Sequence, residues 1–363
     1  MDGQPSRASA APGHGASIPG VTVSVTNIAG DKVAELGLEA TSTAGLLKKT
    51  LHELHGIPRF RQHLLVGGRV LQDHDGLADL AAPVEVQLVR LPFREEASTG
   101  LLRHAELHGD QLVIEGDLRA GACPNAARSE DGATALVLAS ASGHLAIARM
   151  LVEASAEVDK AMKDGTTALS TAVQNDDLEL VRYLRDARAD VDWVAHEGST
   201  LLLLAAEGGS RALVEYLCAA KGDVDRATDE GVTPLLAAAD SSNLDAIDCL
   251  CSARAEVNAC MRNGTTPLFA AAQKGCLAAV ARICEARAEL DRPKASGATP
   301  LFISAQQGHL AIARHLSEAR ADGGRAKDDG ATPLFIAAQH GHLQVTRLLL
   351  AAGAERGPRQ LGG

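Results

Sequence analysis

The chain has 363 residues, of which 2% are aromatic, and a formal net charge of −11. This length allows two or three domains, and so few aromatic side chains are typical of stacked aliphatic units rather than of an enzyme core. The acidic balance argues against a nucleic-acid partner, because contact with phosphates needs a basic face.

Residues 1–20 are rich in Ala, Gly, Pro and Ser and show no hydrophobic periodicity, so we expect a disordered tail. They lack the basic and apolar regions of a signal peptide, and no apolar run in the chain reaches the roughly 18 residues of a membrane span. The seven cysteines do not suggest a disulfide framework. We therefore expect a cytoplasmic protein without membrane insertion, with the nucleus as an alternative.

Residues 21–93 follow a different pattern. Apolar and polar residues alternate on both sides of Ala29 and Gly30, which predicts a β-hairpin. A helix is expected from Thr43 to Gly56, and the segments HLLVGGRVL and VEVQLVRL supply further strands. The predicted apolar face of this helix consists of four leucines, Leu46, Leu47, Leu51 and Leu54.

Local motifs in this segment resemble ubiquitin and its β-grasp fold. They are Gly-Ile-Pro at 56–58, QHLLVGG at 62–68, Leu-Gln-Asp at 71–73 and LADL at 77–80. The resemblance implies an α+β domain with an apolar contact patch for other proteins at Ile28, Leu65 and Val89. The alternative is that these residues complete the core of the domain or pack on the segment that follows.

No diglycine follows the last strand of this segment, where Pro92 and Phe93 stand instead, so we do not expect a conjugated modifier. Residues 94–130 are interpreted as a linker with a degenerate capping repeat. Leu102 and Ala105 imitate a first helix, and Leu118 with Gly121 imitates a second helix and its end. The turn signature is missing, as is usual for a terminal repeat.

From residue 131 to 354 the chain repeats itself every 33 residues. Glycine recurs from Gly132 to Gly330, threonine follows two places later, and leucine two places after that. The glycine suits a tight turn, the threonine can cap a helix, and a proline at the first helical position follows in four repeats. A second apolar helix closes each unit, so a period of this length predicts a solenoid of helix pairs.

The repeat pattern DGxTPLxxAAxxGHLxxxxxLLxxGA resembles the ankyrin repeat, and seven copies cover residues 131–354. The resemblance implies an α-solenoid in which β-hairpin turns and first helices line one groove, which is the surface that binds other proteins. Residues 355–363 form a C-terminal tail, whose final Gly-Gly we attribute to chance because it follows a repeat rather than the β-grasp segment.

The family's variable positions flank the turn glycine and precede the mid-repeat glycine. Acidic side chains are frequent at the turns, so charge complementarity favours a basic or polar protein segment as the ligand. Trp193 is either a contact hot spot or packs on its own hairpin. The predicted groove residues are Asp131, Asp164, Gln174, Trp193, His196, Glu197, Glu207, Glu230, Asp240, Arg262, Asn263, Gln273, Lys274, Gln306, Gln307, Asp329, Gln339 and His340.

Departures from the family pattern give further expectations. Phe269, Phe302 and Phe335 replace the usual histidine and should form a buried ladder, and Cys218, Cys251 and Cys284 should form a column of small buried hydrophobes. Four arginines and Lys221 stand where a glycine usually ends the second helix, and we interpret them with the acids two places later as a solvated mixed face.

We find no phosphate loop, HExxH, GxSxG or paired Cys-x-x-Cys motif. The sequence therefore predicts no enzyme activity, no cofactor and no metal. It favours an adaptor whose ankyrin groove binds a target protein while the ubiquitin-like domain docks on the ubiquitin–proteasome machinery. The alternative is a plain scaffold or regulatory subunit, in which the ubiquitin-like domain is only a structural cap.

Overall fold

The computed structural model describes residues 20–39, 41–80, 84–107, 109–195, 198–220 and 223–353. The predicted tails, 1–20 and 355–363, lie outside these ranges apart from Gly20. The chain forms two compact units. The first comprises Met1–Gly100, Glu115–Cys123 and Glu153–Ser155, and the second comprises Leu101–Ile114, Pro124–Val152 and Ala156–Gly363. Because residues 94–130 contribute to both units, the predicted domain boundaries stay predictions.

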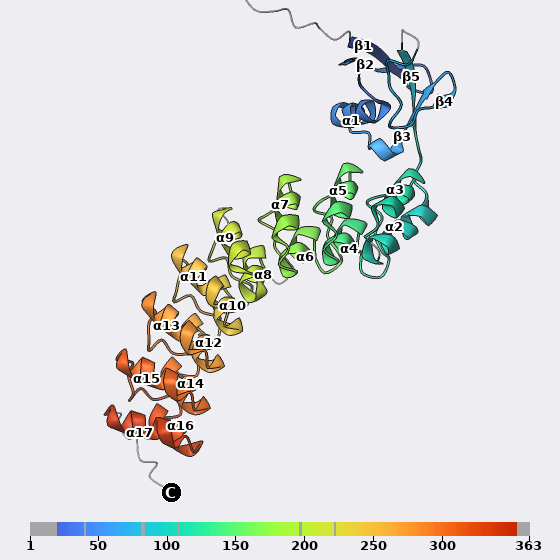
Figure 1. Cartoon of the computed structure of the whole chain (residues 1–363). Coiled ribbons are helices and arrows are strands. Elements are labelled where there is room, and N and C mark those ends of the chain that lie inside the picture. Colours follow the sequence, from blue (N-terminus) through green and yellow to red (C-terminus); the bar gives the residue numbers. More distant parts are fainter. Residues whose placement is uncertain are drawn as a thin grey trace, which may run out of the picture. The chain divides into compact units, whose positions relative to one another are not determined.

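The first unit contains a mixed five-stranded sheet with the strand order β2-β1-β5-β3-β4. β1 and β5 run parallel, and the other neighbouring strands pair antiparallel. Together with the helix that follows β2, this is the arrangement of a β-grasp-like domain (Figure 1). Its elements are β1 (Gly20–Thr26), β2 (Lys32–Glu39), α1 (Ala44–His55), the short 3-10 helix η1 (Arg59–Arg61), β3 (Gln62–Val66), β4 (Arg69–Val70) and β5 (Val84–Arg90).

Side-chain alternation places one face of this sheet in the core. Val84, Val86 and Leu88 of β5 are buried beside Leu47 and Leu51 of α1. The predicted four-leucine face of the helix was wrong in part, because Leu46 is 45% exposed and Leu54 59%. Leu46 is turned about 100° from Leu47 around the helix axis, and Leu54 lies in the last turn before the C-cap.

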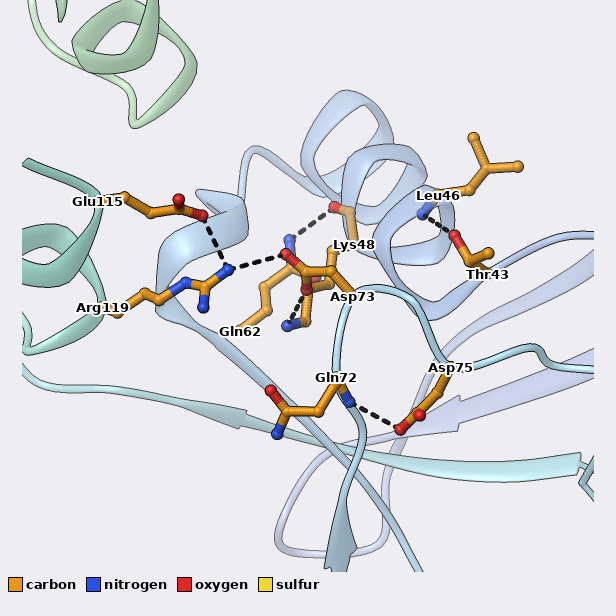
Figure 2. A network of polar contacts seen from close by, with 9 residues as sticks. All are labelled: Thr43, Leu46, Lys48, Gln62, Gln72, Asp73, Asp75, Glu115 and Arg119. Carbon is orange, nitrogen blue, oxygen red and sulfur yellow. Dashed lines mark hydrogen bonds and ion pairs between the residues drawn. The ribbon is translucent and has the colours of Figure 1, made fainter. Parts of the chain in front are cut away.

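A polar network ties the helix to the loops around it (Figure 2). The Gln62 side chain is buried, and its Nε2 donates to the carbonyls of Lys48 at 2.9 Å and Ile57 at 2.7 Å. Lys48 Nζ lies 2.6 Å from Asp73 Oδ1, and Arg119 Nη2 lies 3.4 Å from Asp73 Oδ2. Burial raises the pKa of Asp73, but the hydrogen bond and charge of Lys48, with the charge of Arg119, lower it more, and the net pKa is lowered.

Helix pairs follow one another along the rest of the described chain (Figure 1). The first helices are α2 (Glu95–Leu107), α4 (Ala135–Ala141), α6 (Ala168–Gln174), α8 (Leu201–Gly208), α10 (Pro234–Ser241), α12 (Pro267–Lys274), α14 (Pro300–Gln307) and α16 (Pro333–Gln339). The second helices are α3 (Gln111–Arg119), α5 (Leu145–Glu153), α7 (Leu178–Asp186), α9 (Arg211–Ala219), α11 (Leu244–Ser252), α13 (Leu277–Glu285), α15 (Leu310–Glu318) and α17 (Leu343–Ala351).

The turns before the first helices α4 to α16 have the predicted chemistry, and each ends in a capping threonine. Thr266 caps α12, because its hydroxyl accepts the Phe269 N–H at 3.2 Å, and a proline occupies the first helical position. Gly264 has a φ of +81°, and a Cβ there would lie 2.9 Å from the Ala295 nitrogen of the next turn. Glycine therefore serves both the left-handed conformation and the close approach of neighbouring turns.

Successive repeats bury their apolar faces on one another, as helices α4 to α16 pack in chain order. Leu250, Ile283 and Leu316 of the second helices are fully buried. The predicted burial of the phenylalanines is confirmed for Phe269 and Phe302 but not for Phe335, which is 49% exposed. Phe335 belongs to the last described helix pair, so no further described repeat covers its ring.

The arginines that replace glycine at the ends of the second helices adopt the left-handed backbone conformation that glycine would take. Arg188, Arg254, Arg287 and Arg320 adopt positive φ values between 65° and 71°, whereas Lys221 lies outside the described residues. Such a conformation costs roughly 1–2 kcal/mol for a residue with a Cβ, and a cation near the helix C-terminus offsets part of that cost.

The expected burial of the cysteine column was wrong, because Cys218, Cys251 and Cys284 are only half-buried. Each directly follows a buried residue of its helix, Leu217, Leu250 or Ile283, and is therefore turned about 100° away from that residue around the helix axis.

Candidate protein-binding groove

One column of side chains lies in the last turns of the first helices, one per repeat at a spacing of 33 residues. All of its members are exposed except Gln306, which is half-buried. Glutamine occupies four of the six positions, and carboxylates occupy two neighbouring ones. The column consists of Gln174, Glu207, Asp240, Gln273, Gln306 and Gln339.

A second set of predicted groove residues lies in the turns that join one repeat to the next, which we call fingers. Here four predicted contact residues stabilise their own turn, because each side chain accepts the backbone N–H two residues further on, at 2.9–3.1 Å. These residues are Asp131, Asp164, Asn263 and Asp329. Their side chains therefore shape the finger in addition to any contact they make.

Charge pairing strengthens two of these turns. The hydrogen bond from Arg128, followed by the Ala133 N–H, holds the pKa of Asp131 well below its usual range. The side chain of Lys327, again with a backbone N–H, lowers the pKa of Asp329. Both carboxylates thus remain charged at neutral pH.

Neighbouring fingers are joined by backbone hydrogen bonds. The N–H of Lys163 donates to the carbonyl of Asp131 at 2.9 Å, and that of Arg262 to the carbonyl of Glu230 at 3.1 Å. The Arg262 and Glu230 side chains are both exposed, with Nη1 and Oε1 4.0 Å apart. Each of these bonds therefore joins two adjacent fingers, and Arg262 and Glu230 project from the second joined pair.

The contacts of Trp193 favour a packing role within the repeats over a role as a binding hot spot. Its ring is half-buried, and Nε1 donates to the Gly165 carbonyl of the preceding finger at 3.0 Å. The side chain therefore links two successive fingers. His196 and Glu197, predicted as groove residues on the next finger, lie outside the described residues.

Three predicted groove residues directly follow the helical column in later repeats, and all three are exposed: Lys274, Gln307 and His340. Lys274 Nζ lies 3.1 Å from Asp240 Oδ2, which joins two adjacent repeats through an exposed ion pair. Gln307 is exposed at the end of α14. The Nδ1 of His340 is 3.0 Å from the carbonyl of Ile336, and its ring stacks on that of His342 with centroids 6.2 Å apart.

The groove is hollowed where three repeats meet. A pocket of about 460 Å³ is lined by α8, α10, α12 and the two fingers between them. Three of its polar lining residues, Glu207, Asp240 and Gln273, were predicted as groove residues, but its apolar floor was not predicted. The apolar residues Val232 and Met261 in the fingers were the sequence signal for that floor. The lining residues are Glu207, Val232, Leu236, Ala237, Asp240, Ser241, Met261, Thr265, Ala270 and Gln273.

The two carboxylates of this pocket influence each other. Burial raises the pKa of Glu207, and repulsion by Asp240 raises it further. Among the described residues none forms a hydrogen bond or ion pair with Glu207. The rim of the pocket therefore carries negative charge that Lys274 neutralises only on the Asp240 side.

The predicted patch of the β-grasp-like unit is accessible. Ile28, in the turn between β1 and β2, is 67% exposed. Leu65 and Val89 are half-buried and lie on neighbouring strands, and they point away from the core because Leu64 and Leu88 fill it. None of the three completes the core of this unit.

Within the described part of the chain, no group of three or more His, Cys, Asp or Glu side chains is placed to hold a metal ion. No helix in the described ranges is both long and apolar enough to cross a membrane.

The fold and the groove define a repeat protein in which stacked helix pairs present a continuous surface. A family model described as Ankyrin repeats (3 copies) matches residues 105–195, 187–260, 254–324 and 289–359. The chain belongs to the ankyrin repeat family, whose repeats are generally protein–protein interaction modules. A comparison with curated proteins found no match.

Proposed function

We propose that this protein is a non-enzymatic adaptor whose groove of first helices and fingers binds a target protein. Two features carry the proposal. The first helices present a column of polar side chains at a fixed spacing, and a pocket with an apolar floor lies beside this column at α8, α10 and α12. Exposed apolar surface next to polar groups is typical of protein contact sites.

Site-specific photo-crosslinking in cells tests the groove. A photoreactive residue at Gln273 or Gln307 should capture partner proteins, because both positions are exposed on first helices. The same residue at Arg314, exposed on the second helix α15, is the matched control and should capture few. Equal capture at all three positions, or capture at Arg314 alone, would refute the groove as the binding surface.

The β-grasp-like unit is proposed as the second binding module, with ubiquitin-system proteins as candidate partners. Ile28, Leu65 and Val89 support this because they are accessible apolar side chains outside the core. Leu65→Asp should reduce the recovery of proteasome receptors, ligases or deubiquitinases, whereas Thr22→Asp, at an exposed position of β1, should not. Unchanged recovery with Leu65→Asp would remove this half of the proposal.

The alternative function is a plain scaffold in which the β-grasp-like unit is a structural cap. It is favoured by contacts inside the first compact unit, where Arg119 of α3 pairs with Asp73 and the Arg94 N–H donates to the Gly121 carbonyl at 2.8 Å. A urea titration of the chain without residues 1–92 distinguishes the two. A large loss of stability in the remaining repeats supports the cap, and an unchanged midpoint supports an independent binding module.

A further inference from the structure

The column of groove residues is acidic at only one place. Glu207 and Asp240 stand in the last turns of α8 and α10, and glutamine stands at the equivalent position in the other four repeats from 174 to 339. A carboxylate in the last turn of a helix is unfavourable, because the helix dipole is negative there. These two acids therefore weaken their own helices, which the neutral glutamines do not.

The two carboxylates stand over the pocket of about 460 Å³ between α8, α10 and α12. Leu236, Ala237 and Ala270 are buried beneath it, and Met261 is half-buried at its side. The combination of an apolar floor and an anionic rim matches a side chain that has a long aliphatic stem and a cationic end. Lysine and arginine are the protein side chains of this kind.

Within the described ranges, only one of the two carboxylates at the pocket has a cationic partner. Asp240 has Lys274 at 3.1 Å, an exposed pair of the kind that contributes little. Glu207 has no hydrogen-bonding or cationic partner among the residues that the structure describes, and its pKa is raised by burial and by Asp240. A cation placed between the two carboxylates would remove this repulsion.

We propose that this pocket holds one lysine or arginine side chain of an extended segment of a partner protein. The aliphatic stem lies on Leu236, Ala270 and Met261, and the cationic group bonds to Glu207 and Asp240. The exposed fingers and glutamines that continue beyond the pocket provide the surface for the rest of the segment. This inference rests on the proposed function of the groove.

A displayed library of random ten-residue peptides, selected on the immobilised full chain, tests the inference. Enriched peptides should share a lysine or arginine at one position, and replacing that residue by alanine should weaken binding about tenfold or more, as expected for a charge-assisted contact. Glu207→Gln should weaken the same peptides to a similar degree. Glu318→Gln, an equal change of charge at an exposed position of the second helix α15, should leave binding within about twofold.

A charge reversal makes the test directional. Selection on the Glu207→Lys variant should no longer enrich the basic anchor, and the circular dichroism spectrum should match that of the wild-type chain because Glu207 is exposed. Peptides that bind the groove without a fixed basic residue, or that are insensitive to Glu207→Gln, would overturn the pocket assignment but leave the adaptor function standing. If selection yields no peptide that binds the chain, or if the bound peptides crosslink only outside the groove, both the pocket assignment and the groove as the binding surface fail.

Discussion

Gly308 is required to be glycine for two reasons, its left-handed backbone and its close approach to the next repeat, and mutation can separate the two. It ends α14 with a φ of +74°, and a Cβ there would lie 2.5 Å from Nδ1 of His342 in the next repeat. Gly341 has the same φ of +74°, but nothing lies within 4 Å of its added Cβ. Gly308→Ala therefore meets both backbone strain and a collision, whereas Gly341→Ala meets only the strain.

The expected magnitudes follow from these contacts. The left-handed conformation costs a residue with a Cβ roughly 1–2 kcal/mol, which is the whole expected effect of Gly341→Ala. In Gly308→Ala the His342 ring must move away, which breaks its 3.0 Å contact with the Gln306 carbonyl. Loss of that hydrogen bond and of packing adds about 1–3 kcal/mol. The free energy of unfolding should therefore fall by about 3 kcal/mol in Gly308→Ala.

Urea titration followed by circular dichroism measures both variants, with hydrogen exchange of α14 to α17 to localise the change in a repeat protein that can unfold in parts. Because Gly341 lies in the last helix pair that the structure describes, Gly143→Ala serves as an internal control, with a φ of +69° and nothing within 4 Å of its added Cβ. In a His342→Ala background, Gly308→Ala should cost no more than the controls. Equal destabilisation by Gly308→Ala and Gly341→Ala in the wild-type background would refute the reasoning.

Burial and charge elsewhere in the stack give three more expectations. Phe269→Ala should lower the free energy of unfolding by about 3–5 kcal/mol, whereas Phe335→Ala should cost far less because that ring is 49% exposed; equal losses in a urea titration would contradict the burial. The Arg128 hydrogen bond lowers the pKa of Asp131 from 3.8, so the stability advantage of the wild-type chain over Asp131→Asn should be full at neutral pH, decline below about pH 3.8, and be lost as the pH falls through the lowered pKa of the folded state. A pH-independent difference would count against it. Burial, with the charge of Glu285, raises the pKa of Cys284 to about 11, so its alkylation rate, followed by mass spectrometry, should keep rising about tenfold per pH unit up to about pH 10, and a rate that levels off near pH 9 would disprove the shift.

The repeat architecture was predictable because each unit carries its own local signals. Turn glycine, capping threonine and proline at the first helical position act within a few residues, as Gly264, Thr266 and Pro267 show. The β-grasp-like sheet was predictable for the same reason, since its strands alternate and its helix has a threonine cap at Thr43 and a glycine end.

What the sequence did not reveal depends on neighbouring repeats. Phe335 and Phe269 occupy equivalent positions, and only the presence of a following repeat distinguishes the exposed ring from the buried one. The sequence also does not show how far Asp131 and Asp164 serve their own turns rather than a ligand, because an exposed acid in a loop looks the same in either role. The lining of the groove pocket joins residues from three repeats, which no single period displays.

Hydrogen–deuterium exchange of the full chain, with and without a library-selected peptide that contains the basic anchor, tests the central claim most directly. We predict slower exchange in α8, α10, α12 and the fingers between them, with little change in the second helices α9, α11 and α13. Protection of the second helices instead, or no protection in the groove at saturating peptide, would contradict the account.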